Sequence, residues 1–186
     1  MAGARTTEMT DDPDVAVGDR RALEAFFAEH YRRLVGLAGL VCGDVASAED
    51  IVQTSLERAW RARATMRDDT RLRPWLDRIV VREAAREKRS RMTWLGRLIR
   101  PPTVSEIEAP AREVVDLDAS RFPERLAMRQ AFDGLGAAHR SVVVLVFDAG
   151  YSVDETAELL GVPRETVRSR LRAAREHLRY ALREGS

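Results

Sequence analysis

The sequence predicts an all-α protein of two small helical domains joined by a flexible linker, with a helix-turn-helix in the C-terminal domain. Apolar residues recur at intervals of three and four along most of the chain, as they do on the buried face of a helix. Segment 98–121 interrupts this pattern with three prolines. A length of 186 residues suits two small domains. We therefore expect a disordered tail (1–18), a first domain (19–97), a linker (98–121) and a second domain (122–186).

Three helices are expected in the first domain. Asp19 can cap the first helix, and Gly43 ends it. Ser47, with an acid three residues later, is the expected cap of the second helix, and Pro74 suits the first turn of the third. These helices are expected over about 19–42, 47–64 and 74–91, with a loop over 65–73.

The second domain is predicted to contain two helices, at about 123–135 and 138–149, followed by a helix-turn-helix. The apolar run 142–147 has a strand-like composition, but its short flanking helices favour a buried helix. Ser152 and Glu155 have the spacing of a capping box, and Gly161 can end that helix in a left-handed conformation. Pro163 then suits the start of a second helix. Such a second helix lies in the DNA major groove in helix-turn-helix proteins.

The last helix has one apolar face and one basic face. The segment 163–183 holds seven arginines and two glutamates, a local charge of +5. An arginine face of this kind can neutralise phosphates and pair with guanine, although most charge runs are only solvated helix faces. The apolar positions are Val167, Leu171, Ala174, Leu178 and Leu182, and the basic ones are Arg164, Arg168, Arg172, Arg175 and Arg179.

Charge is segregated along the chain although the net charge is only +1. Segment 61–91 carries a local +6, and segment 103–120, within the linker, carries a local −4. Two basic blocks separated by an acidic one suggest two contact sites for a polyanion. The arginines of the third helix, at 78, 82, 86 and 89, form a basic face at helical spacing.

Several function classes lack their signatures. Cys42 is the single cysteine, so no internal disulfide is expected, and a reducing cytoplasm is compatible with the composition. We see no signal peptide and no apolar run of membrane-spanning length. Metal-ligand spacings, glycine-rich phosphate loops and nucleophile–base pairs are also missing. We therefore expect no enzyme, catalytic residue, cofactor or metal, and no membrane insertion.

Two blocks resemble bacterial RNA polymerase sigma factors of the extracytoplasmic-function (ECF) group. The segment 48–60, AEDIVQTSLERAW, is similar to the core-polymerase-binding segment, and 73–91, RPWLDRIVVREAAREKRSR, is similar to the helix that follows it. The segment 135–182 resembles the fourth conserved region of the family, with its Thr-Val-x-Ser-Arg at 166–170. The resemblance covers about 22–92 and 122–183, in the family's order.

The resemblance implies a dissociable subunit that binds core RNA polymerase, through its β and β′ subunits, and directs initiation at promoters. It also implies an anti-sigma protein as a partner. The residues implied to bind the clamp helices of the largest subunit are Asp50, Gln53, Glu57 and Arg58. Those implied to bind the −10 element are Arg71, Arg73, Arg78, Arg82, Arg86 and Arg89. Those implied to read the −35 element are Arg164, Glu165, Thr166, Arg168, Ser169, Arg172 and Arg175.

The chain departs from the family pattern at several positions. Arg82 and Arg86 stand where the family usually has Asn and Asp, which adds positive charge to the −10 surface. Pro163 replaces the usual serine cap, and Thr156 replaces the usual Ile. The acidic linker is implied to thread into the polymerase, and its 24 residues can reach roughly 80 Å when extended.

Two other functions are compatible with parts of the sequence. A dimeric repressor or activator could use the same helix-turn-helix without polymerase, but it would leave the 48–60 block unexplained. A nucleic-acid hydrolase would need clustered carboxylates to bind metal ions, whereas the acids here are scattered or lie in the linker.

Overall fold

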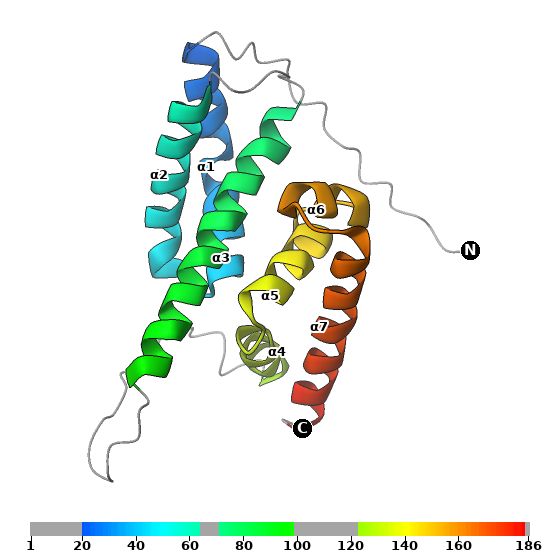
Figure 1. The fold of residues 1–186 in the computed structure, drawn as a ribbon. Coiled ribbons are helices and arrows are strands. Elements are labelled where there is room, and N and C mark those ends of the chain that lie inside the picture. Colours follow the sequence, from blue (N-terminus) through cyan, green and yellow to red (C-terminus); the bar gives the residue numbers. More distant parts are fainter. Residues whose placement is uncertain (1–19, 64–70, 99–122, 185–186) are drawn as a thin grey trace.

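The computed structural model describes residues 20–63, 71–98 and 123–184. These residues form α-helices and one π-helical turn, with no strand among them (Figure 1). The all-α prediction is thus confirmed. The predicted tail, nearly all of the linker and most of the predicted 65–73 loop lie outside the described residues. The elements are α1 (Arg20–Cys42), α2 (Val45–Ala62), α3 (Leu72–Leu98), α4 (Pro123–Asp133), α5 (Ala137–Val143), the π-helix η4 (Val144–Asp148), α6 (Val153–Leu160) and α7 (Arg164–Glu184).

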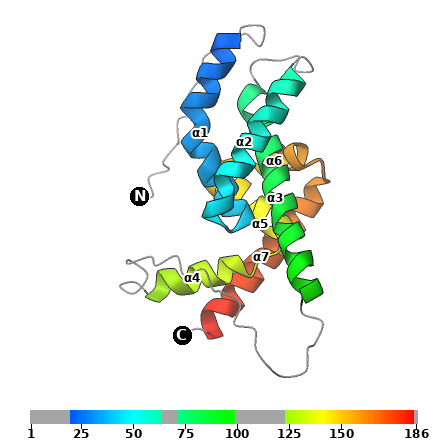
Figure 2. The same cartoon turned by 90° about the vertical axis from the view of Figure 1, so that its left-hand side faces the viewer.

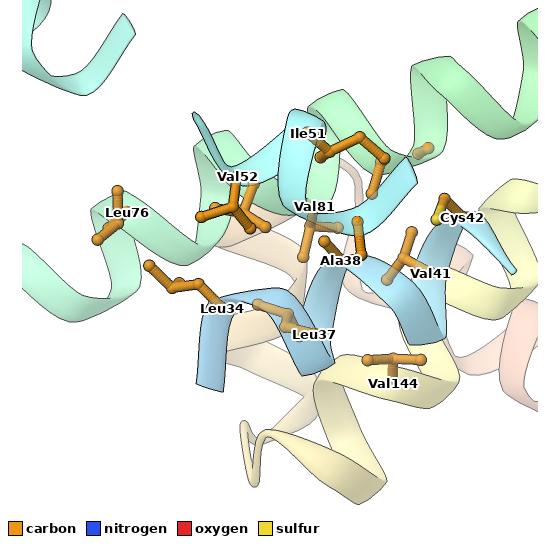
Figure 3. Packing of buried hydrophobic residues seen from close by; sticks show 14 of the residues in the cluster. Leu34, Leu37, Ala38, Val41, Cys42, Ile51, Val52, Leu76, Val81 and Val144 are labelled. Atoms are coloured by element: carbon orange, nitrogen blue, oxygen red, sulfur yellow. The ribbon is translucent and has the colours of Figure 1, made fainter. Parts of the chain in front are cut away.

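Helices α1, α2 and α3 pack side by side and bury the apolar residues that the periodicity predicted (Figures 1 and 2). Their side chains interdigitate in one cluster, as Figure 3 shows. Cys42 belongs to this cluster, as a packing residue, and burial raises the pKa of its thiol. The members from α1–α3 that Figure 3 labels are Leu34, Leu37, Ala38, Val41, Cys42, Ile51, Val52, Leu76 and Val81.

Helix α2 begins earlier than the sequence predicted. Its cap is Asp44, whose backbone is extended and whose carboxylate accepts a hydrogen bond from the Ala46 N–H at 3.3 Å. Ser47 is therefore not the cap, and its hydroxyl instead donates to the Asp44 carboxylate at 2.6 Å. Gly43, at φ +82°, turns the chain sharply after α1, so that the next residue, Asp44, already caps the new helix.

Helix α3 is longer than predicted at both ends. It begins at Leu72, so Arg73 is helical rather than part of the expected loop, and it continues to Leu98. Pro74 lies in the first turn, as predicted, where its missing N–H would have had no intrahelical partner.

The second half contains the predicted helix-turn-helix, formed by α6 and α7. The Ser152 hydroxyl accepts from the Glu155 N–H, and the Glu155 carboxylate accepts from the Ser152 N–H, which completes the capping box. Gly161 has φ +69° and ends α6 as predicted. The 142–147 run is helical, also as predicted, but it widens into η4, where the Ala149 N–H donates to the Val144 carbonyl.

The two halves share one buried cluster. Ala137, Val144, Leu145 and Leu159 of the second half pack with the core of α1–α3. Helices α5 and α6 lie against α3, and α5 also contacts α1 (Figure 1). Helix α4 packs on α7 instead (Figure 2). In the described part of the chain, no helix combines the length and the hydrophobicity that crossing a bilayer would require.

The buried hydroxyl of Thr156 is expected to lower the stability of the fold. Its side chain is fully buried, and its hydroxyl has no hydrogen-bond partner among the described residues. Replacing Thr156→Val keeps the shape and removes the buried polar atom, so we expect the free energy of unfolding to rise by roughly 1 kcal/mol. The midpoint of urea unfolding measures this change. Thr93→Val is the control, because the exposed Thr93 hydroxyl donates to the Arg89 carbonyl; a larger gain for the control would contradict the assignment.

Candidate nucleic-acid and partner interfaces

Helix α7 presents its arginines on the face opposite its buried side. Val167 and Ala174 are buried against the rest of the second half, whereas the five arginines of the predicted basic face are all exposed. Four of these arginines, at 168, 172, 175 and 179, line a shallow groove of about 350 Å³ together with Leu171 and Glu176. The predicted two-faced helix is therefore present, and its positive face is open to a polyanion.

The first turn of α7 places the remaining −35 candidates near each other. The Glu165 carboxylate forms an ion pair with the Arg168 guanidinium, with 2.7 Å between Oε1 and Nη1. This pair holds the guanidinium along the helix surface. The Ser169 hydroxyl donates to the Thr166 carbonyl at 3.0 Å. Nε of Arg164 forms an ion pair with the Asp154 carboxylate of α6 at 2.9 Å. This ion pair links the two helices of the helix-turn-helix.

The arginines of α3 are exposed but differ in their surroundings. Arg78, Arg82, Arg86 and Arg89 are all exposed, as the periodicity predicted. Partial burial, and then the charge of Arg78, lower the pKa of Arg82. A Cβ atom placed on Gly161 would lie 3.3 Å from Nη2 of Arg82, so this guanidinium touches the turn of the helix-turn-helix.

The other two −10 candidates lie where the two halves meet. Arg71 forms an exposed ion pair with Glu158 of α6 at 3.2 Å. Arg73 is half-buried, and its Nε is buried with no hydrogen-bond partner among the described residues. The structure thus separates these two residues from the regular arginine face of α3.

The polar residues of α2 form one exposed face, and a groove of about 410 Å³ runs between this helix and α3. Asp50 and Arg58 line the groove, and Arg86 and Glu83 close it from α3. An ion pair from Arg58 to Glu83 crosses it. Gln53 and Glu57 are exposed outside the groove. The structure therefore places Arg86, a −10 candidate, beside two candidates for polymerase binding.

Asp77, a fully buried carboxylate between the two halves, is not among the residues that the sequence pattern predicted. Its carboxylate is fully buried and accepts hydrogen bonds from Arg33 at 2.9 and 2.7 Å. It also accepts from the hydroxyl of Tyr151 at 2.8 Å. Burial, and then the nearby Asp77 charge, raise the pKa of Tyr151 far above its usual range. The spacing could have indicated its burial, because Asp77 lies four and seven residues before the apolar Val81 and Ala84, on the same helix face.

No group of three or more His, Cys, Asp or Glu residues in 20–63, 71–98 and 123–184 is arranged to hold a metal ion. These surfaces can therefore recognise a partner by charge pairing, by hydrogen bonding and by complementary shape.

Both halves match known families. Residues 26–93 match the Sigma-70 region 2 family and residues 131–180 match Sigma-70 region 4. The chain is 32% identical to the ECF RNA polymerase sigma factor SigM of Mycobacterium tuberculosis, over 87% of this chain and 77% of that protein. It is 31% identical to SigL of the same organism, over 91% and 93%. It is 29% identical to the RNA polymerase sigma-H factor of Pseudomonas aeruginosa, over 89% and 88%.

Two solved structures share the fold. One is the sigma factor RpoE in complex with the anti-sigma factor NepR from Bartonella quintana, with a TM-score of 0.62, 23% identity, and coverage of 88% of this chain and 98% of that chain. The other is CnrH in complex with the cytosolic domain of CnrY, with a TM-score of 0.66, 24% identity, and coverage of 94% and 100%.

The arginine face of α7 generates a prediction about salt dependence. Each phosphate contact that is lost should reduce the slope of log affinity against log salt by about 0.9. We expect Arg172→Ala and Arg175→Ala to weaken binding to duplex DNA and to flatten this slope, as measured by fluorescence anisotropy over a salt series. Arg32→Ala, at an exposed position on α1, is the matched control. Unchanged slopes for both variants would show that this face does not contact phosphate.

Proposed function

This chain belongs to the ECF group of RNA polymerase sigma factors, and from that premise we propose which of its surfaces bind core polymerase and which bind promoter DNA. As an alternative sigma factor, it binds core RNA polymerase and directs transcription from specific promoters. We propose that it acts in the cytoplasm and has no catalytic activity of its own, since the bond-forming chemistry belongs to the polymerase.

The exposed face of α2 is our proposed docking surface for core polymerase. Asp50, Gln53, Glu57 and Arg58 are exposed along a single helix whose opposite side is anchored by the buried Val52 and Ala59. The ion pair between Arg58 and Glu83 braces this helix against α3. A rigid helix with acids on its outer face suits a partner that presents basic side chains.

The arginines of α3 are our proposed contacts for the −10 element. Melted strands are held by backbone charge and by capture of unstacked bases, and a cationic helix face supplies the first of these. Arg82 and Arg86 replace the Asn and Asp usual in the family, so this surface favours phosphate contacts over hydrogen bonds to base edges.

Helix α7 is our proposed reader of the −35 element. It is the second helix of the helix-turn-helix, and Arg164, Thr166, Arg168 and Ser169 lie in its first two turns, the part that reaches base edges in such motifs. Arginine at such positions can pair bidentately with guanine. The single observation that carries the whole proposal is that one chain presents both an exposed polar face on α2 and an exposed arginine face on α7.

The dimeric repressor is the less favoured function, because it uses only the second half, whereas the chain matches both sigma regions in order. We also propose that an anti-sigma factor binds this chain. The two similar structures are complexes in which a sigma factor is bound by NepR or a CnrH chain by CnrY.

Reversing the charge of the α2 face tests core binding. The double variant Asp50→Arg and Glu57→Arg should weaken the affinity for core polymerase at least tenfold, because close like charges oppose docking. Size-exclusion co-elution and anisotropy titration with purified core polymerase measure this affinity. The double reversal of Glu24 and Glu29, exposed on α1, is the control. Full-strength binding by the α2 variant would refute the assigned surface.

Arg168→Ala tests promoter reading. We expect initiation on −35-dependent promoters to fall roughly 5- to 150-fold, which corresponds to about 1–3 kcal/mol for one arginine–base contact. Reconstituted transcription on a panel of promoters measures initiation, and co-elution should show unchanged binding to core polymerase. Arg32→Ala, at an exposed position on α1, serves as the control substitution. A loss of core binding in the Arg168 variant would contradict the division of roles.

A further inference from the structure

The last turns of α3 project beyond the start of α2 and carry a large exposed aromatic side chain (Figures 1 and 2). This residue is Trp94, four positions before the end of α3 at Leu98, and its side chain is 63% exposed. An indole ring has more apolar surface to bury than most side chains, and tryptophan is enriched among the residues that dominate binding at protein interfaces. The residues around Trp94 therefore decide what kind of partner could cover it.

Trp94 continues a row of α3 residues that faces α2. Glu83, Glu87 and Ser90 line the groove between the two helices, at spacings of four and three. A further step of four leads to Trp94, and residues at these spacings share one helix face. The row therefore begins in the groove and ends at an exposed aromatic ring, one helical turn past the last α3 residue that lines the groove.

An ion pair fixes this end of the groove. Nη1 of Arg91, the residue after Ser90, lies 2.7 Å from Oδ2 of Asp44, which caps α2. The hydroxyl of Ser47, on the groove side of α2, donates to the same carboxylate at 2.6 Å. The start of α2 is therefore fastened to α3 three residues before Trp94, which fixes the backbone that carries the ring relative to the α2 face.

The charges of the groove differ between its two ends. At the end away from Trp94, the Glu83 carboxylate pairs with two arginines, so its charge is compensated. At the end nearer Trp94, Asp50 and Glu87 contribute two carboxylates, and neither forms an ion pair within the part of the chain that the structure describes. Carboxylates beside an exposed indole suit arginine or lysine side chains, which can pair with the acids and stack on the ring.

The arginine face of α3 points in another direction. Arg82 and Arg89 each precede a residue of the row by one position, which is a rotation of about 100° around the helix. Thr93, rather than Trp94, is the next position on that face, four residues after Arg89. Trp94 therefore lies on the acidic side of α3, where carboxylates repel phosphate, and its position favours a protein partner over DNA.

We propose that the row ending at Trp94 extends the docking surface for core polymerase from α2 onto α3, with Trp94 as its apolar anchor. This inference rests on the proposed docking role of α2, because the groove is continuous with the α2 face through Asp50 and Arg58. The occupant is a basic segment of core polymerase, whose arginine or lysine side chains pair with the groove acids and cover the indole ring.

Trp94→Ala tests the anchor. We expect the affinity for core polymerase to fall about tenfold, as is typical when an aromatic anchor of an interface is truncated. Trp94→Phe should retain most of the affinity, because it keeps an aromatic face. Met92→Ala should bind unchanged and is the matched control, because Met92 is also 63% exposed near the end of α3 but lies outside the row. Anisotropy titration with purified core polymerase measures the affinity, and circular dichroism checks that each variant is helical.

The holoenzyme distinguishes a polymerase contact from a DNA contact. At core concentrations that saturate every variant, Trp94→Ala should bind a single-stranded −10 oligonucleotide as tightly as the unsubstituted chain. A photoreactive benzophenone side chain at position 94 should crosslink to the β or β′ subunit. Crosslinking to DNA alone would overturn the proposal, as would a loss of oligonucleotide binding with unchanged affinity for core polymerase.

Comparison with the α2 charge reversal separates this inference from the proposed function. If the Asp50→Arg and Glu57→Arg double variant weakens core binding but Trp94→Ala does not, the docking surface stops at α2 and the inference fails alone. If only Trp94→Ala weakens it, the α2 assignment fails and the α3 contact stands. If neither weakens it, or the unsubstituted chain does not bind core polymerase, both fail. Equal losses for Trp94→Ala and Met92→Ala would also overturn the inference, since the row would then have no special role.

Discussion

The buried carboxylate of Asp77 is the constraint on which the arrangement of the helices depends. A charge in the interior must be matched by hydrogen bonds, and Asp77 draws them from two directions: from Arg33 of α1 and from Tyr151 ahead of α6. The first contact sets how α1 and α3 pack. The second links this three-helix unit to the helix-turn-helix. One acidic residue on the apolar side of α3 therefore contributes hydrogen bonds both within the first half and between the first half and the second.

The proposed working surfaces are built on rigid helices whose opposite sides are buried. Helix α2 is anchored by Val52 and Ala59, and α7 by Val167 and Ala174. Because these positions alternate with exposed ones at helical spacing, each interface is displayed as a straight row of side chains. Neither interface needs a cofactor or an enclosed pocket, since both would act by charge and hydrogen bonding.

On the exposed surfaces, acidic residues partly neutralise the charge of the arginines. Asp154, Glu158 and Glu165 pair with arginines proposed to contact DNA. Exposed ion pairs of this kind contribute little to stability, so phosphate can replace the acid at small cost. The net charge of only +1 is consistent with this balance. On α3, Arg82 and Arg86 add exposed positive charge.

The amino-acid sequence alone determined the helices, their exposed and buried faces, the capping box at Ser152 and the turn at Gly161, because these depend on local spacing and backbone preference. Local rules also indicated the wrong cap for α2, where the tight turn at Gly43 made Asp44 available first. Only the tertiary structure brought Tyr151 to Asp77, placed Arg140 at the end of α1, and set Arg86 beside Asp50. These contacts join residues 36 to 100 positions apart along the chain, and periodicity within a single helix carries no information about which distant side chain completes a buried hydrogen bond.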